Sequence, residues 1–565
     1  MPVTPNYKID KKSLPYPDEA ELRAAAMAGK KSNEPDTPTQ QIVREIWASR
    51  LRLPQEVIDL DDDFSAIGGH SMRAQEILFD VKRWANKSFP MTIIFRNPTV
   101  RSFAAAIDAA LDPANHSAIE SANTTDNVTY AEAAEILKES QLPRSFPTGS
   151  LQGQNILLTG ATGFLGAAIL TKCLSQDLKV IALVRAKSEA DALQRIKTSC
   201  TAYFKWSESW IPHIKCILGD ISEENLGLDG KVWKMLETTV DIVIHNAAVV
   251  HWIRTYRSLE PTNVLSTVSL IKLCSLGKKK HITFISSTAV LDSGKYPTGS
   301  PVLEIDDLER SCTGLTSGYG QTKYVSEFLL REAGKLGLQS AIVRPGYITG
   351  NADTGIGPTD DFLLRMLKGS VQLECRPDLA RNTINLVPVS YCVDVVVSAS
   401  LTQALRRCKE EGCGVTVYHV TPHPQLSFNA FLANLQSCGY KCPLVSYEKW
   451  RAKLEEYVKS HDADREPHAL LPLFDWVTSD LPSDTSSKLL DDVNTQALLR
   501  DYGSDSTTQS QVRVTEETVR AYLRFMVGVG FLDPPTSSSD GEELGRLGMT
   551  RSQRDAFDKV GRGGA

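Results

Sequence analysis

The sequence lacks the features that mark membrane-spanning and secreted proteins. No run of about 18 apolar residues occurs, and no basic segment followed by an apolar one opens the chain. Its 11 cysteines are sparse for 565 residues, and the pairs Cys408/Cys413 and Cys438/Cys442 do not have the repeated spacing of a zinc site. We therefore expect a cytoplasmic protein with reduced thiols, no membrane segment and no bound metal.

The chain also lacks the positive charge that nucleic-acid binding requires. Its 62 Lys and Arg residues are outnumbered by 68 Asp and Glu residues, which gives a formal net charge of −6. Because phosphate backbones select clustered Lys and Arg, we expect no nucleic-acid partner. The hydrophobic share of 42% is ordinary for a globular protein, and the length predicts more than one domain.

Composition changes sharply within the first 150 residues. Residues 1–34 are rich in Pro and Lys and predict a linker. Residues 35–111 carry apolar residues at three- and four-residue spacing, which predicts a small helical bundle. Residues 112–150 are rich in Ser, Thr, Asn and Pro and predict a second linker.

The remainder of the chain has a different pattern. Residues 151–425 alternate short apolar runs with helical spacing, which predicts a Rossmann-like, doubly wound parallel α/β sheet. Residues 426–535 predict a mainly helical C-terminal subdomain, and residues 536–565 a flexible tail. The first five predicted strands, in chain order, are residues 155–159, 180–184, 214–218, 242–244 and 282–285.

A serine opens an amphipathic helix in the N-terminal module. Ser71 follows Gly68 and Gly69, which permit a tight turn and the close approach of another protein. At a helix start, its hydroxyl lies near free backbone N–H groups and the positive end of the helix dipole, which favour a phosphate. The same position suits a helix cap, and the two roles are compatible.

The string from Gly68 to Ser71, with the preceding helix and Asp63-Phe64, resembles the 4′-phosphopantetheine attachment site of thiolation domains in nonribosomal peptide synthetases. The likeness covers roughly residues 38–111. It implies that 4′-phosphopantetheine is covalently attached to Ser71. A phosphopantetheinyl transferase is then an expected partner.

A glycine-rich turn joins the first predicted strand to a helix. Gly160 permits the sharp turn, Gly163 lets the backbone approach a pyrophosphate, and Gly166 lets helix and strand pack closely. The spacing GxxGxxG resembles that of extended short-chain dehydrogenase/reductases and implies a dinucleotide cofactor. The residues expected to bind it here are Thr159, Gly160, Thr162, Gly163, Phe164, Leu165 and Gly166.

The end of the second predicted strand indicates which dinucleotide. Arg185 stands where an acidic residue would bind the ribose diol of NAD, and an arginine there accommodates the NADP 2′-phosphate, so NADPH is favoured. A plain surface arginine at a strand end is the open alternative. By likeness to the family, Asp220 and Ile221 contact the adenine, and Asn246 and Ala247 lie beside the cofactor.

Tyr319 and Lys323 are four residues apart at the start of a predicted helix and so share one face. A lysine ammonium beside a phenol favours phenolate, so we expect a lowered Tyr319 pKa. The pair resembles part of the Ser/Thr-Tyr-Lys triad of the same family. That likeness implies Ser287 as the triad hydroxyl, with Thr288 as the open alternative, and cofactor contacts for Tyr319 and Lys323.

The order of these parts resembles the thioester-reductase half of carboxylic acid reductases and, most closely, of fungal L-2-aminoadipate reductases. The likeness spans nearly all of residues 38–535 and rests on segments 245–252, 359–373 and 384–389. It makes residues 35–111 the carrier domain, residues 151–425 the NADP-binding reductase core and residues 426–535 the substrate subdomain.

The resemblance implies NADPH-dependent reduction of a phosphopantetheine-tethered acyl or aminoacyl thioester to a released aldehyde. The 2-aminoadipyl group of lysine biosynthesis is the favoured substrate. Another carrier-bound acid of a fungal specialised pathway, or a non-catalytic carrier or scaffold, is the alternative. Asp360, Asp361 and Arg365 are candidates for contacting a polar acyl chain, and a helix cap with an i,i+4 ion pair explains them equally well.

One part of that family is missing from the sequence. Such enzymes begin with a large adenylating domain, and residues 4–15 resemble only its closing motif, with Lys8 at the position of its catalytic lysine. We therefore expect that a separate adenylating or acyl-loading enzyme charges Ser71, or that an N-terminal adenylation domain belongs to the complete protein.

Overall fold

The computed structural model describes residues 34–560 with several gaps. The gaps are residues 52, 65–66, 70, 86, 88, 90–92, 95–96, 112–128, 150, 152, 252–253, 298, 381, 402–413, 460–465, 480, 482–486, 503–512, 536–543 and 545–547. Lys8 and the predicted N-terminal linker lie outside the described residues. The chain forms two compact units, an N-terminal unit up to Asn127 that also includes Leu471–Asp475, and a larger unit made of the remaining residues.

The N-terminal unit is helical. Its long helices are α2 (Pro38–Leu51), α3 (Ser71–Ala85) and α5 (Val100–Leu111). The Trp47 ring is fully buried and lies 5.0 Å from the Phe64 ring and 6.2 Å from the Phe103 ring. Arg50 pairs with Asp80 at 2.6 Å and so joins α2 to α3. The apolar residues at helical spacing therefore meet in one small core, as predicted.

The larger unit is built on a seven-stranded parallel sheet in the order β11-β6-β5-β4-β1-β2-β3. The strands are β1 (Ile156–Thr159), β2 (Val180–Val184), β3 (Ile214–Leu218), β4 (Ile242–His245), β5 (His281–Ile285), β6 (Gln339–Pro345) and β11 (Val415–Val420). The strands β1, β2, β4 and β5 are buried along their whole length, as expected for a parallel sheet covered on both faces. The predicted fold class is confirmed.

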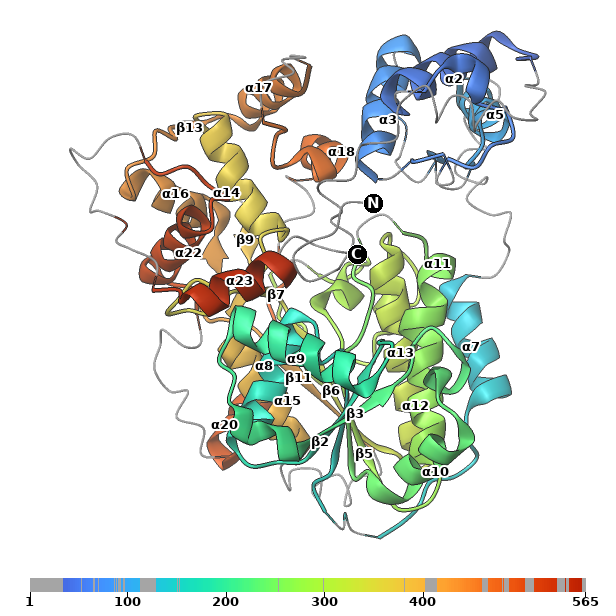
Figure 1. Cartoon of the computed structure of the whole chain (residues 1–565), viewed down its shortest axis with the longest axis vertical. Helices are drawn as coiled ribbons and strands as arrows, with labels where there is room; N and C mark the ends of the chain where they lie inside the picture. Colours follow the sequence, from blue (N-terminus) through green and yellow to red (C-terminus); the bar gives the residue numbers. More distant parts are fainter. Residues whose placement is uncertain are drawn as a thin grey trace, which may run out of the picture. The chain divides into compact units, whose positions relative to one another are not determined.

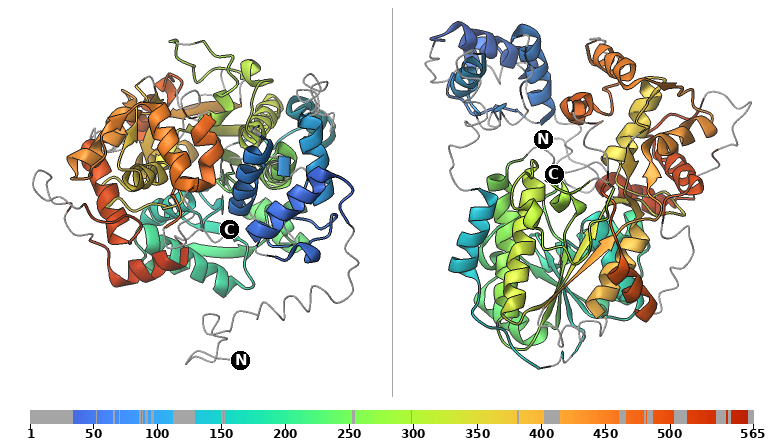
Figure 2. Two further views of the ribbon diagram at one scale, coloured as in Figure 1. Left: turned by 90° about the horizontal axis from the view of Figure 1, so that it is seen from above. Right: turned by 180° about the vertical axis from the view of Figure 1, so that it is seen from behind.

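Helices cover both faces of this sheet (Figure 1 and Figure 2). One layer contains α8 (Phe164–Ser175), α9 (Glu189–Tyr203), α15 (Val389–Leu401) and α20 (Val493–Tyr502). The other contains α7 (Tyr130–Gln141), α10 (Gly230–Thr239), α11 (Tyr256–Glu260), α12 (Ser266–Cys274) and α13 (Gly318–Lys335). Side chains alternate along β1, so that Ile156 and Leu158 join the core beneath the first layer and Leu157 the core beneath the second.

The rest of the larger unit is a mainly helical region with short strand pairs. Its helices are α14 (Phe362–Gln372), α16 (Phe428–Ser437), α17 (Tyr447–Lys459), most of α18 (Phe474–Ser479), α22 (Glu516–Gly528) and α23 (Arg551–Val560). Its strands are β7 (Tyr347–Thr349) with β10 (Leu386–Pro388), β8 (Arg376–Pro377) with β13 (Leu444–Val445), and β9 (Thr383–Ile384) with β12 (Leu426–Ser427). The ring of Phe362 lies 6.3 Å from Phe428 and 5.0 Å from Trp476, which ties α14 to α16 and α18.

Shorter helical turns connect these elements. They are η1 (Gln55–Val57), η4 (Glu208–His213), η5 (Glu224–Gly227), η6 (Pro261–Leu265), η7 (Thr288–Leu291), η8 (Glu309–Ser311) and η10 (Leu471–Leu473). Among the described residues, no helix combines the length and the apolar character that crossing a bilayer requires. In the same residues, no group of three or more His, Cys, Asp and Glu side chains is arranged to hold a metal ion.

Three helices differ from the predicted domain organisation. Although it lies in the predicted linker 112–150, α7 packs on α13, and Tyr130 contacts Tyr324 with ring centres 5.4 Å apart. Although it lies within residues 426–535, α20 packs on the core sheet against α15 and β11. In the predicted flexible tail, α23 buries Phe557. In each case a short apolar motif is buried by an element distant in sequence, which local composition does not reveal.

Candidate active site

The glycine-rich turn has the geometry of an anion-binding site. Gly160 follows β1 with φ +74°, and a Cβ on it would lie 2.9 Å from the Ala247 backbone. A Cβ on Gly166 would lie 1.9 Å from the carbonyl oxygen of Gly160, so helix and strand approach as closely as predicted. Gly163 caps α8 without a side-chain hydrogen bond, which leaves the N–H groups of the first turn to a ligand. The turn therefore fits the pyrophosphate of a dinucleotide.

Thr159 ties this turn to the end of β4. Its hydroxyl accepts hydrogen bonds from the backbone N–H groups of Asn246, at 3.1 Å, and Ala247, at 3.0 Å. The Asn246 side chain in turn donates to the carbonyl of Gly160 at 3.3 Å. The ring of His245, the last residue of β4, bonds Thr159 at 2.9 Å. Burial lowers the pKa of His245 to about 3, so this ring is neutral.

Arg185 and Asp220 meet where β2 and β3 end. The guanidinium of Arg185 lies 3.4 Å from the Asp220 carboxylate and is 78% exposed. Asp220 accepts bonds from the N–H and hydroxyl of Ser222, and these bonds, with Arg185, hold its pKa below the usual range. An exposed ion pair of this kind is weak, so Arg185 can exchange Asp220 for a phosphate. The arrangement fits the predicted NADP 2′-phosphate contact.

Tyr319 and Lys323 lie on the first turns of α13, which Ser317 caps by accepting the Gly320 N–H at 3.0 Å. The ammonium nitrogen of Lys323 lies 5.8 Å from the centre of the Tyr319 ring. It donates to the carbonyl of Ile285 at 2.6 Å, at the end of β5. Burial lowers the pKa of Lys323 to about 7. The predicted pair is thus brought together beside the carboxyl end of the sheet.

The pKa of Tyr319 differs from the expectation. Burial raises it to about 12, and a hydrogen bond with the Ser287 hydroxyl lowers it only in part. Lys323 does not reverse this shift, because its own burial disfavours the charged ammonium and the Ile285 carbonyl takes one of its N–H groups. The predicted lowering is therefore wrong for this state of the protein, and the phenol keeps its proton at neutral pH.

The hydroxyl groups after β5 have separate partners. Ser287 caps η7 by accepting the Ala289 N–H at 3.2 Å, and it is the hydroxyl bonded to Tyr319. Ser286 donates to the carboxylate of Glu327 at 2.5 Å, away from the phenol. Thr288 is the first residue of η7. The geometry therefore favours Ser287 over Thr288 as the triad hydroxyl.

Behind the triad lies a buried ion pair that sequence reasoning missed. Glu327 is four residues after Lys323 on α13, and its carboxylate accepts from the Arg344 guanidinium at 2.6 Å with both side chains fully buried. Arg344 donates to Nε2 of His419 at 3.2 Å, so Nδ1 of His419 carries the proton that it donates to the carbonyl of Asp491 at 2.8 Å. The one signal in the sequence for this ion pair was a glutamate four residues after Lys323, on the same face of the helix.

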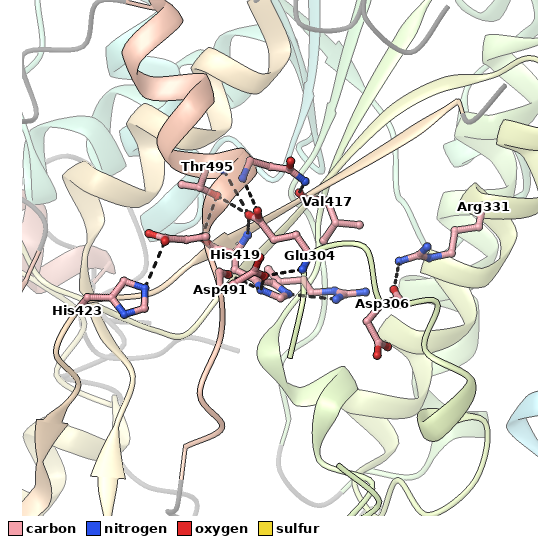
Figure 3. A network of polar contacts seen from close by, with 11 residues as sticks. Glu304, Asp306, Arg331, Val417, His419, His423, Asp491 and Thr495 are labelled. Carbon is pink, nitrogen blue, oxygen red and sulfur yellow. Dashed lines mark hydrogen bonds and ion pairs between the residues drawn. The ribbon is translucent and has the colours of Figure 1, made fainter. Parts of the chain in front are cut away.

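The network continues to the segment before α20 (Figure 3). Glu304 accepts the His419 N–H at 2.8 Å and the Thr495 hydroxyl at 2.9 Å. The N–H of Glu304 donates to Asp491 at 2.6 Å. Hydrogen bonds therefore run without a break from the loop after β5, through α13, β6 and β11, to the start of α20.

Comparisons with known proteins show the family to which the chain belongs. The family model described as "Male sterility protein" matches residues 158–396, and the model "Phosphopantetheine attachment site" matches residues 41–107. The terminal R domain of the myxalamid PKS-NRPS pathway is 30% identical, with all of that chain and 72% of this one covered and a TM-score of 0.62. The chain belongs to this family of terminal reductase (R) domains.

Other relatives are similar over nearly the whole of this chain. The L-2-aminoadipate reductase large subunit of Penicillium chrysogenum is 41% identical over 95% of this chain, and the L-2-aminoadipate reductase of Schizosaccharomyces pombe is 37% identical over 100%. The chain spans about 40% of the length of each of these curated relatives. A thiolation-reductase di-domain of an archaeal nonribosomal peptide synthetase has the same fold, with a TM-score of 0.66 over 89% of this chain at 21% identity.

The attachment domain that precedes the R domain has the predicted turn. Gly68 has φ +95°, and a Cβ on Gly69 would lie 2.3 Å from the carbonyl oxygen of Phe64, which is fully buried. Ser71 is the first residue of α3. Its side chain, and the whole of His70, lie outside the described residues. The backbone therefore presents Ser71 as predicted, at the opening of a helix.

Asp360 and Asp361, the predicted candidates for contacting the acyl chain, have a structural role. Asp361 caps α14 by accepting the Leu363 N–H at 2.8 Å. Arg365 donates to the backbone carbonyls of Asp360 and Ala469, each at 3.0 Å, and so holds the start of this helix. Burial raises the pKa of Asp361 to about 6. The structure thus supports the helix cap, whereas Arg365 bonds backbone carbonyls instead of forming the predicted i,i+4 ion pair with Asp361.

Proposed function

We propose that this chain reduces an acyl group, held as a thioester on the phosphopantetheine arm of Ser71, to an aldehyde with NADPH as the reductant. The observation that carries the proposal is the grouping of Tyr319, Lys323 and Ser287 at the carboxyl end of the sheet, with the Lys323 ammonium 5.8 Å from the centre of the Tyr319 ring. A phosphopantetheine attachment domain in the same chain supports a tethered substrate.

When bound, NADPH supplies the hydride that reduces the carbonyl carbon. Tyr319 gives its proton to the carbonyl oxygen as negative charge develops there, and Ser287 stabilises that charge as a second donor. Because the pKa of Tyr319 is raised, the phenol carries its proton before the reaction and can act as the donor. The resulting hemithioacetal then collapses: the carbon–sulfur bond breaks and the hydroxyl proton passes to the sulfur, which gives the aldehyde and the free pantetheine thiol. Tyr319 regains its proton from solvent.

The other residues hold the cofactor in place. Lys323 is fixed by the carbonyl of Ile285 and keeps further N–H groups for the nicotinamide ribose. The exposed guanidinium of Arg185 binds the 2′-phosphate, which selects NADPH over NADH. NADH that works as well as NADPH would refute this role for Arg185 alone.

The acyl group we propose is 2-aminoadipyl, because the relatives that cover nearly all of this chain are named L-2-aminoadipate reductases. The partners we propose are a phosphopantetheinyl transferase and an adenylating activity, either a separate enzyme or a further domain. The nine described cysteines are free, which supports a reducing, cytoplasmic compartment. A specialised-metabolite acyl group is the second candidate, since the myxalamid relative is a terminal R domain of such a pathway.

The decisive experiment uses the full chain with its arm attached. Ser71 is converted to the phosphopantetheinyl form and loaded with 2-aminoadipyl or with other acyl groups, and NADPH oxidation and trapped aldehyde are measured together. We expect oxidation only with loaded protein, and fastest with 2-aminoadipyl. A chain carrying Ser71→Ala is the matched control. No oxidation with any thioester would contradict the function, and equal rates with all of them would contradict the substrate.

A further inference from the structure

A line of aromatic rings connects the glycine-rich turn to the C-terminal helix. Phe164, the first residue of α8, packs edge-on against Tyr203 at the end of α9, with ring centres 5.1 Å apart. Tyr203 meets Phe557 of α23 at 6.0 Å, and Phe557 meets Phe525 of α22 at 5.3 Å, both at 90°. The helix α23 packs on α9, and Figure 1 shows it next to α22.

Hydrogen bonds follow the same route. Ser199 of α9 donates to the carbonyl of Thr162, inside the glycine-rich turn, at 2.9 Å. Gln553 of α23 donates to the carbonyl of Phe204, just past the end of α9, at 3.2 Å. The Phe204 ring also stacks on Phe164, with centres 5.6 Å apart. The turn is therefore held by α9 at two points, and the end of α9 is held by α23.

Phe557 is the larger of the two buried side chains of α23. In α23, the residues Ala556 and Phe557 are buried, and the charged residues around them are exposed. Phe557 is 4% exposed, Tyr203 is 6% exposed, and Phe525 is fully buried. Ala556 and Phe557 form the buried apolar face of α23, and Phe557 supplies the larger part of it, beside the Gln553 hydrogen bond to Phe204.

We propose that α23 is a positioning element for the dinucleotide. Phe557 presses Tyr203 against Phe164 and thereby holds the first turn of α8, whose N–H groups receive the pyrophosphate. Phe557 touches no reacting atom. The proposal rests on the use of NADPH by this turn, and it adds that the extreme C-terminal helix sets the affinity for the cofactor.

The two faces of the sheet separate this effect from the chemistry. The rings of Phe164 and Phe557 belong to the side of α8 and α9, whereas Tyr319 and Lys323 lie on α13, which covers the opposite face. A loosened α23 should therefore weaken NADPH binding but leave the rate at saturating NADPH unchanged.

The test measures the dissociation constant for NADPH on the full, unloaded chain by titration calorimetry. We expect Phe557→Leu, which keeps apolar volume but loses the ring contacts, to raise it by roughly three- to tenfold. Phe557→Tyr keeps the ring and should restore wild-type affinity. If Phe557→Leu does not fold, Phe557→Met is measured in the same way.

Two controls separate positioning from general destabilisation. Arg554→Ala changes an exposed residue on the same helix and should alter nothing. Phe431→Leu removes a buried ring of α16 that packs on Phe428, so it should lower the melting temperature without changing the dissociation constant. Phe557→Leu with a lowered melting temperature but unchanged NADPH affinity would overturn the proposal. Because binding needs no acyl group, a wild-type chain that binds NADPH but reduces no thioester would refute only the proposed function.

Discussion

At the scale of single residues, the hydroxyl groups after β5 show how partners separate chemistry from structure. Ser286 and Ser287 are neighbours, yet Ser287 bonds the Tyr319 phenol while Ser286 bonds the carboxylate of Glu327. The first contact lies where a reacting carbonyl would be held, and the second is fully buried behind it. Replacing Ser287 should therefore affect mainly catalysis, whereas replacing Ser286 should affect mainly stability.

We expect Ser287→Ala to lower kcat by about 100- to 1,000-fold, because one donor to the developing oxyanion is lost. Loss of the η7 cap should lower its unfolding free energy by about 1 kcal/mol. We expect Ser286→Ala to lower the unfolding free energy by about 1–3 kcal/mol, because a buried carboxylate loses a hydrogen bond. Steady-state kinetics and denaturant unfolding on both variants distinguish the two roles. A large kcat loss in Thr288→Ala, with none in Ser287→Ala, would assign the triad hydroxyl to Thr288 instead.

Tyr319 illustrates how burial prepares a proton donor. Its pKa of about 12 means that the phenol does not titrate at neutral pH, so activity should show no limb from this group below that value. Tyr319→Phe removes the proton but keeps the ring, and we expect kcat to fall by about 100- to 10,000-fold. NADPH affinity, measured by calorimetry, should stay close to that of the wild type. Unchanged turnover of a loaded Tyr319→Phe chain would remove Tyr319 from the mechanism.

At the scale of elements, the cap of α14 makes stability depend on pH. The folded-state pKa of Asp361 is about 6, above the ordinary value of 3.8, so the protonated form is the one that folding favours. Its contribution to stability is complete below pH 3.8 and is lost as the pH rises through 6. An uncharged capping side chain of the same shape would keep its contribution to stability as the pH rises.

Asp361→Asn keeps a capping side chain without the charge. We expect the unfolding free energy of the variant, relative to that of the wild type, to increase as the pH rises from 4 to 6 and to stay constant above that range. Asp361→Ala loses the cap and should be about 1 kcal/mol less stable than Asp361→Asn at every pH. Chemical denaturation across this range measures both differences. A pH-independent difference between Asp361→Asn and the wild type would show that the Asp361 pKa is not raised.

The ion pair of Glu327 and Arg344 joins α13 to β6 directly behind the triad. Replacing one partner leaves the other charge buried, so we expect Arg344→Met to lower the unfolding free energy by about 3–5 kcal/mol. Lys335→Met is a matched control, because Lys335 pairs with Glu332 on the same helix but is 71% exposed. That change should cost less than about 1 kcal/mol. Equal costs for the two variants would contradict the importance of burial.

At the scale of the whole molecule, the carrier and the R domain are separate compact units in one chain. A tether raises the effective concentration of the arm at the site without any new contact. If the tether has only this effect, the arm of one chain can also reach the reductase site of another. Two inactive chains should then complement each other when mixed. We expect Ser71→Ala and Tyr319→Phe together to recover activity that rises with protein concentration, at well below the wild-type rate. Aldehyde formation after loading the Tyr319→Phe chain measures this, and no recovery at any concentration would mean that the arm acts only within its own chain.

Much of the site could be predicted because its signals are local. The turn from Gly160 to Gly166 and the four-residue interval from Tyr319 to Lys323 depend only on backbone geometry over a few residues. Alternating apolar runs likewise determine parallel strands and the covering helices. The fold class, the dinucleotide turn and the Tyr-Lys pair therefore followed from the order of residues alone.

Tertiary structure alone decided what depends on distant partners. The direction of the Tyr319 pKa shift follows from burial, and the network from Glu327 to Glu304 joins residues far apart in the chain. The same holds for Phe557, which lies in a segment too polar to predict packing and yet is buried between α9 and α22. Local spacing assigns a residue to an element and a face, but desolvation and charge pairing depend on what folds against that face.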